Sequence, residues 1–423
     1  MGDRAALSRA DRLSRASFAL PQRIGITIPH NLSSSSDAAT GQWSDDTFLD
    51  TLRRSGDPAA DAAVAALIAD GGLAAAGAAF KLLRANDTPL PPDAPQPLKD
   101  FMASSAGLPT TVDPARLANG GRAFLRNALP SVVVLLASSL PRGYAAPCLS
   151  EILGISRDLE RHPFGRLMGV VQLLINISDA GAFQPHGRAI VTAQKLRLLH
   201  AGVRAIAGRY RPGYQERFGV PVNHEDMLAT IMAFSWLLIE GIRRLDLPLG
   251  DDEAKDLYYL WRVFALLMGI HPPGRPHDDS LIPQTIADAA TFYEAYVRRN
   301  DTTAERNPYG VVLAQDNLAM MTAMIWWPLR LIGLGWAPRI AMTELLTPEE
   351  LARLGVTPLV GHNAIKAGLA LILRLGRDVG VHTSFAARLS RLLLQGMVDV
   401  DRRGEVPFSI PMSQEDLRSA AFE

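Results

Sequence analysis

The segment that follows Asn223 is apolar on almost every side. It reads MLATIMAFSWLLIEGIRRL from Met227 to Leu245, so its apolar residues are not confined to one face of a helix. Such a helix must be enclosed by other elements, because any face left in water would expose large apolar side chains. Asn223 can cap its first turn, where Glu225 and Asp226 suit the helix dipole. We therefore predict a central helix that the rest of the chain surrounds.

The remainder of the chain also carries helical patterns. Apolar residues recur at helical spacing, and the alternation typical of half-buried strands is nearly absent. The sequence contains no glycine-rich dinucleotide turn, phosphate-binding loop or Gly-X-Ser-X-Gly elbow. We predict an all-α fold, a single large helical domain with a globin-like core and additional N- and C-terminal helices. Nucleotide-dependent and serine-hydrolase functions have no support.

Three sections are expected along the chain. Residues 1–113 are predicted to form an N-terminal helical extension with a proline-rich linker at 88–97. Residues 114–345 should form the core, and residues 346–423 a helical cover.

Several helix boundaries can be predicted from capping residues and prolines. The run Ser44-Asp45-Asp46-Thr47 can cap a helix through Leu52, and Asp57-Pro58 can open another. Thr347 begins a third capped helix. A helix from Pro114 is expected to end at Leu140, because Pro141 follows it.

Charge and cysteine content narrow the possible partners. Lys+Arg and Asp+Glu both number 43, so the global charge suggests neither nucleic acid nor an anionic membrane as a partner. Cys148 is the only cysteine, which excludes an intrachain disulfide, a thiolate zinc site and a covalently attached c-type haem. Its apolar surroundings indicate a small buried side chain rather than a nucleophile. We see no secretory signal and no membrane-spanning run, which predicts a cytoplasmic protein of undetermined oligomeric state.

A basic helix is predicted between Arg188 and Arg211, with one histidine in it. At about 100° per residue, Arg197 and Arg204 fall within roughly 60° of His200 around the helix. The sequence has no acidic residue between 181 and 215. The anion that balances these guanidinium groups must therefore come from elsewhere in the fold, from solvent or from a ligand. A haem would offer an iron to the imidazole and propionates to the guanidiniums.

An ordinary structural role explains the same residues equally well at this point. A single histidine on a half-buried helix is commonly a core residue, and arginines at helical spacing commonly coat a solvated face. His224-Glu225 lacks the second histidine of a zinc-protease motif, since Leu228 stands four residues after His224. His271 and His277 lie in a Pro/Gly loop that reads as solvated rather than as a metal site.

The segments KLRLLHAGVR, RYRPGY and GVPVNHEDMLATIMAFSWLLIEGIRRL resemble one known family. They are similar to the catalytic domain of the latex clearing proteins (rubber oxygenases) and related bacterial and fungal oxygenases. The resemblance covers roughly residues 117–335 and is densest at 164–244. It implies an all-α protein with a non-covalent b-type haem, and it implies that His200 is the proximal iron ligand. It matches Arg166 to an arginine on the distal side of the haem, and Arg197 and Arg204 are expected to bind propionates.

The resemblance also implies a catalytic glutamate and a hydrophobic substrate. Glu151 is the candidate base by position, with Glu160 as the second choice. The sequence departs from rubber-cleaving members at Gly169 and Val170, where they carry a lysine and a threonine after the distal arginine. Glycine cannot ligate iron.

The implied reaction is dioxygen-dependent attack on a carbon–carbon double bond of an isoprenoid or lipid-like molecule, with cleavage to carbonyl products as one outcome. The departure leaves an alternative open: a non-catalytic haem- or lipid-binding helical protein that retains the fold.

Overall fold

The computed structural model describes residues 41–69, 83–156, 163–325, 327–331 and 333–359, and the isolated positions 361 and 368. Within these residues every regular element is helical, so the predicted all-α fold is confirmed. Residues 39–423 form one compact unit. The predicted N-terminal extension up to residue 40 and the predicted helices at 363–375 and 384–395 fall almost wholly outside the described residues. The predicted section boundaries after residues 113 and 345 stay predictions.

The enclosed helix lies at the centre, as predicted, but it is divided in two. Helix α12 (His224–Phe234) is buried along its whole length except at Thr230, and α13 (Trp236–Arg244) follows it. Ser235 separates them with φ −118° and ψ −83°, and its hydroxyl donates to the Ile231 carbonyl at 2.8 Å. A serine that bonds back into its own helix competes with the backbone ladder, which accounts for the break.

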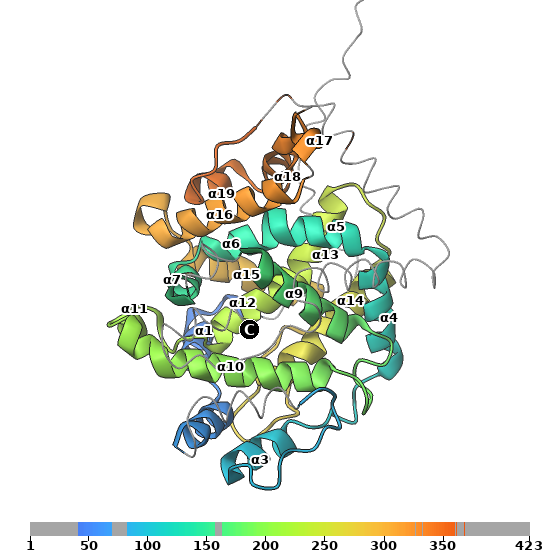
Figure 1. Cartoon of the computed structure of the whole chain (residues 1–423), viewed down its shortest axis with the longest axis vertical. Helices are drawn as coiled ribbons and strands as arrows, with labels where there is room; N and C mark the ends of the chain where they lie inside the picture. The colour runs from blue at the N-terminus through green and yellow to red at the C-terminus, as the bar shows by residue number, and fades with distance from the viewer. Residues whose placement is uncertain are drawn as a thin grey trace, which may run out of the picture. The chain divides into compact units, whose positions relative to one another are not determined.

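Other helices surround this centre (Figure 1). Helices α1 (Asp46–Arg53), α14 (Asp251–Leu267) and α15 (Ile286–Asn300) pack directly against α12. The remaining helices are α3 (Gln96–Ser104), α4 (Pro114–Arg126), α5 (Ala128–Val134), α6 (Leu140–Tyr144), α7 (Pro147–Ser156), α9 (Pro163–Ser178), α10 (Ala189–Tyr210), α11 (Tyr214–Phe218), α16 (Pro308–Met324), α17 (Trp327–Leu331), α18 (Ala337–Leu345) and α19 (Pro348–Arg353). Short turns η1 (Gly41–Ser44), η2 (Leu135–Ser139), η3 (Ala304–Arg306) and η4 (Leu334–Trp336) connect them.

The helix around Pro141 does not end where the sequence predicts. The chain bends by 77° between α4 and α5, at Asn127, and then stays helical past Pro141 to the end of α6. The π-helical turn η2 accommodates the proline, because widening the turn removes the need for the N–H that proline lacks. The Asn317 side chain donates to the Leu136 carbonyl in this turn at 2.7 Å. The prediction of a break after Leu140 was therefore wrong.

The predicted helix starts are confirmed. Asp45 caps α1 by accepting from the Thr47 N–H, and Thr347 caps α19 with a reciprocal contact from Glu350. Asp57 precedes a helix over residues 58–69 and accepts from the Ala60 N–H at 3.2 Å. By length and composition, no single helix in the described part of the chain could cross a membrane, and only the bent pair of residues 114–126 and 128–144 passes that test together.

Candidate cofactor site

Helix α10 carries the predicted iron ligand and packs against α7, α9 and α14 (Figure 1). His200 lies near its middle, with Arg197 one turn before it and Arg204 one turn after it. The three side chains share a side of the helix, as the spacing predicts. The anions that balance the two arginines come from the helix over residues 58–69 and its cap.

Arg197 forms a buried bidentate ion pair with Asp57. Its Nε and Nη2 donate to the two carboxylate oxygens at 2.6 and 3.0 Å, and the side chains are 7% and 5% exposed. Burial raises the pKa of Asp57, but the hydrogen bond and the charge of Arg197 outweigh it and the net pKa is lowered. We assign the Nε and Nη2 donors of Arg197 to the fold, because both bind Asp57. The propionate contact expected from the sequence stays a prediction.

Arg204 forms a second ion pair, with Asp61, but this one is incomplete. Arg204 Nε donates to Asp61 Oδ1 at 2.7 Å, while its Nη2 is buried and has no hydrogen-bond partner among the described residues. Desolvation raises the pKa of Asp61 despite the nearby guanidinium. Arg204 is thus a buried cation that keeps an unused donor.

His200 is held as a neutral imidazole. Its pKa is lowered from 6.5 to about 4, chiefly by desolvation and then by the charge of Arg204, while the charge of Asp57 opposes the shift. Its Nδ1 atom is buried without a hydrogen-bond partner in the described part of the chain. Buried polar atoms are rarely left in this state unless a ligand or water completes them. The residue as a whole is only half-buried, so part of it retains accessible surface.

A second imidazole, which the sequence analysis did not select for this site, belongs to the same charge cluster. His224 is buried at the first position of α12, and desolvation lowers its pKa to about 4. The groups that act on it next are Asp57, His271 and Arg204. The sequence could show only that both His200 and His224 are present. Their proximity depends on the fold, which brings residue 224 near α10.

Of the predicted catalytic residues, only Glu151 has a described side chain, and its partner is Arg217 rather than His200. Glu151 lies on α7, and both of its carboxylate oxygens accept from Arg217 at 2.7 and 2.8 Å. A proton acceptor at this position would first have to give up one of these bonds. Arg166 lies on α9, but its side chain is outside the described part, and Glu160 is outside it entirely. Gly169 and Val170 are half-buried on the same helix.

The first turn of α12 contains two buried acids with different partners. Glu225 accepts from Arg53 Nε at 2.7 Å and from Arg299 Nε at 3.0 Å. Asp226 has no cation in direct contact among the residues described, and desolvation together with the charge of Glu225 raises its pKa to about 7. The two ion pairs of Glu225 connect α1 and α15 to the start of α12.

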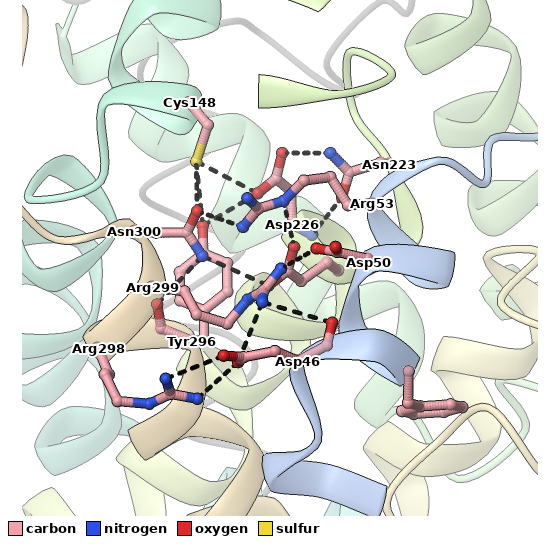
Figure 2. A network of polar contacts seen from close by, with 12 residues as sticks. Asp46, Asp50, Arg53, Cys148, Asn223, Asp226, Tyr296, Arg298, Arg299 and Asn300 are labelled. Atoms are coloured by element: carbon pink, nitrogen blue, oxygen red, sulfur yellow. Dashed lines mark hydrogen bonds and ion pairs between the residues drawn. The ribbon is translucent and has the colours of Figure 1, made fainter. Parts of the chain in front are cut away.

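Asp226 is surrounded by neutral donors (Figure 2). The Tyr296 hydroxyl donates to Asp226 Oδ1 at 3.1 Å, Cys148 Sγ lies 3.3 Å from the same oxygen, and Asn223 Nδ2 donates to Oδ2 at 2.9 Å. Burial and the nearby carboxylate raise the pKa of the Cys148 thiol well above its ordinary value. A thiol that stays protonated is a poor nucleophile, which confirms the buried structural role predicted for this cysteine. Nor does any group of three or more His, Cys, Asp or Glu side chains within the described ranges converge as a metal site.

Three comparisons with known proteins point to the same protein family. Residues 113–375 match the family described as ER-bound oxygenase mpaB/B'/Rubber oxygenase, catalytic domain. The chain is 25% identical to a rubber oxygenase of Streptomyces sp. (strain K30) over 328 residues, which cover 75% of this chain and 74% of that relative. The solved structure of latex clearing protein LCP in the closed state matches with a TM-score of 0.65 at 19% identity, covering 85% of this chain and 94% of that one. The family match spans more than half of the sequence and includes α9, α10 and α12. The chain therefore belongs to the family of ER-bound oxygenase mpaB/B' and rubber oxygenase catalytic domains, and it is an oxygenase.

Proposed function

We propose that the chain is a b-type haem-dependent oxygenase that acts on a hydrophobic, unsaturated substrate, with His200 as the protein ligand of the iron. The observation that carries the proposal is the state of His200: a neutral imidazole with a buried, unpartnered Nδ1, on a helix inside the family match. Metal ligation requires the neutral ring, so this ligand needs no proton to be removed near neutral pH.

The properties of His200 and Arg204 support haem binding. The His200 imidazole is strongly desolvated, while the residue as a whole is only half-buried. Arg204 adds a buried guanidinium with an unused Nη2 donor, which suits one propionate carboxylate. Haem b, when bound, supplies the redox chemistry that activates dioxygen, which the side chains alone cannot supply.

The chain's own residues would bind the haem and orient it. His200 presents the ligating nitrogen, Arg204 compensates a carboxylate charge, and the Asp57–Arg197 pair keeps α10 fixed against the helix over residues 58–69. Arg166 remains our proposal for the distal side of the haem. Gly169 and Val170 offer no lysine there, so the distal side would be open, filled by water or served by another group.

The substrate class follows from similarity and from chemistry. The relative from Streptomyces sp. (strain K30) is named a rubber oxygenase. We propose an isoprenoid or other lipid-like substrate with a carbon–carbon double bond, attacked with consumption of dioxygen. Because Arg217 holds both oxygens of Glu151, we do not assign the base to that residue without a rearrangement of the pair. A cytoplasmic location remains part of the proposal.

Absorption spectroscopy tests the ligand assignment. Purified wild-type protein expressed with added haem precursor should show a Soret band, and His200→Ala should lose it while the far-UV circular dichroism stays helical. His277→Ala, an exposed loop histidine, is the matched control and should keep the band. A His200→Ala variant with an unaltered haem spectrum and content would exclude His200 as the ligand.

Oxygen uptake tests the activity separately. Haem-loaded enzyme should consume dioxygen with a polyprenyl substrate and not with its fully saturated analogue. Equal uptake with both would refute the double bond as the site of attack. A haem-loaded protein that consumes no dioxygen with either would refute the substrate class while leaving the ligand assignment intact.

A further inference from the structure

The stretch from the end of α16 to α18 has an unusual charge pattern. Residues 317–343 contain no aspartate, glutamate, lysine or histidine, and their only charged side chains are Arg330 and Arg339. Neither arginine has an ion-pair partner among the described residues. Over the whole chain Lys+Arg and Asp+Glu are equal at 43 each, and the surface arginines Arg217 and Arg298 are paired with carboxylates. This stretch therefore carries an uncompensated positive charge.

The same stretch exposes large apolar side chains. Trp327 is 61% exposed, Trp336 49% and Met324 40%. Of the seven large apolar side chains that are exposed in the described part of the chain, these three lie within thirteen residues of sequence. Soluble surfaces tolerate single exposed apolar residues, whereas a cluster of this kind marks an interaction site.

These residues lie on consecutive elements of the chain, at the end of α16, in α17 and in η4. Helix α17, which carries Trp327 and Arg330, packs against the turn η4, which carries Trp336 (Figure 1). A Cβ on Gly335, the residue before Trp336, would lie 3.6 Å from Arg330 Cβ, so the two elements are in contact at this point. We call the set Met324, Trp327, Arg330 and Trp336 the Trp327 face.

We propose that the Trp327 face docks the enzyme on the surface of an anionic lipid layer. Tryptophan rings lie preferentially at the boundary between water and hydrocarbon, because the ring is apolar and its N–H needs a polar partner. Arginine side chains nearby are attracted to anionic headgroups, and no carboxylate in this stretch opposes them. A second copy of the chain would bring the same uncompensated arginines together across the contact, which disfavours that occupant.

This docking goes beyond the proposed function, and it would place the enzyme where a substrate of the proposed class is found. A water-insoluble, unsaturated substrate would be dissolved in a lipid layer rather than in bulk water. An enzyme held at that surface would meet its substrate there. The docking itself requires neither haem nor turnover, so its test is independent of the oxygenase assignment.

Vesicle co-sedimentation of the full chain tests the proposal. Wild-type protein should bind phosphatidylcholine vesicles that contain phosphatidylglycerol, and bind phosphatidylcholine vesicles alone more weakly. The double variant Trp327→Ser/Trp336→Ser should weaken binding about tenfold or more, since two exposed rings are lost. Arg330→Gln should weaken it about fivefold, the ratio expected for one basic residue at an anionic surface. Leu129→Ser removes a side chain that is 45% exposed on α5 and should bind as the wild type does.

Three outcomes would overturn the proposal. The first is no binding to either vesicle by wild-type protein with normal far-UV circular dichroism. The second is equal loss of binding in Leu129→Ser and in the double variant, because the Trp327 face would then be no different from any other apolar position. The third is a dimer in light scattering that the double variant converts to monomer without any change in vesicle binding, since the face would then join two copies of the chain.

Discussion

The Asp57–Arg197 pair allows a sharp test of whether Arg197 serves the fold or the cofactor. Both side chains are almost fully buried, and two hydrogen bonds of 2.6 and 3.0 Å join them. Removing one member of such a pair leaves an uncompensated buried charge and costs about 3–5 kcal/mol. Arg197→Met should therefore lower the free energy of unfolding by that amount. Asp57→Asn/Arg197→Met should recover part of the loss, because no buried charge remains.

The pH dependence adds a second, independent readout. The folded-state pKa of Asp57 is below its ordinary value of 3.8, so its contribution is complete above pH 3.8 and is lost as the pH falls through the folded-state pKa. The difference between wild type and Asp57→Asn should be constant from pH 7 to 5 and shrink below about pH 4.

Urea unfolding followed by circular dichroism measures the free energies in both tests. If Arg197→Met unfolds within about 1 kcal/mol of wild type while its haem affinity drops, Arg197 binds the cofactor and the present assignment is incorrect.

Three further predictions concern other buried positions. Gly269→Ala should destabilise the fold more than Gly274→Ala. Both glycines have a positive φ, but only at Gly269 would an added Cβ lie 3.0 Å from Arg197 Nε. Thermal unfolding of the two variants measures the difference in stability. Asp226→Asn should gain about 2–4 kcal/mol of stability relative to wild type as the pH rises from 5 to 8, because a pKa raised from 3.8 to about 7 makes the wild type lose stability as the pH rises from about 4 to 7, after which the loss levels off; denaturant unfolding at pH 5 and at pH 8 measures it. Asn317→Leu should cost about 1–3 kcal/mol by leaving a buried carbonyl of the π turn unpaired, again by denaturant unfolding.

Local features of the fold were predictable from the sequence because their causes are local. The caps at Asp45, Asn223 and Thr347 each bind a backbone N–H two or three residues ahead, so capping residues before an apolar run identify the helix start. The all-α class follows from periodicity along the whole chain. The breaks at Ser235 and Asn127 were missed because serine and asparagine occur within helices as well as at their ends.

The candidate site was predictable only in part. The sequence placed His200, Arg197 and Arg204 on one side of a helix, since that depends on spacing alone. It could not identify Asp57 and Asp61 as partners, which lie 140 and 143 positions away along the chain. The same limit hid the Arg217 partner of Glu151 and the approach of His224. Pairings across such separations are set by tertiary packing, which periodicity does not encode.

The distant acids explain how a strongly basic helix can present a neutral ligand. Without Asp57 and Asp61, burying Arg197 and Arg204 beside one another would cost several kcal/mol per charge. With them, α10 can enter the core while Arg204 still disfavours a proton on His200. Its pKa near 4, against an ordinary value of 6.5, leaves the lone pair free near neutral pH. Iron binding at His200 should then carry no proton penalty near neutrality, so the affinity should depend on pH only where the imidazole itself begins to titrate.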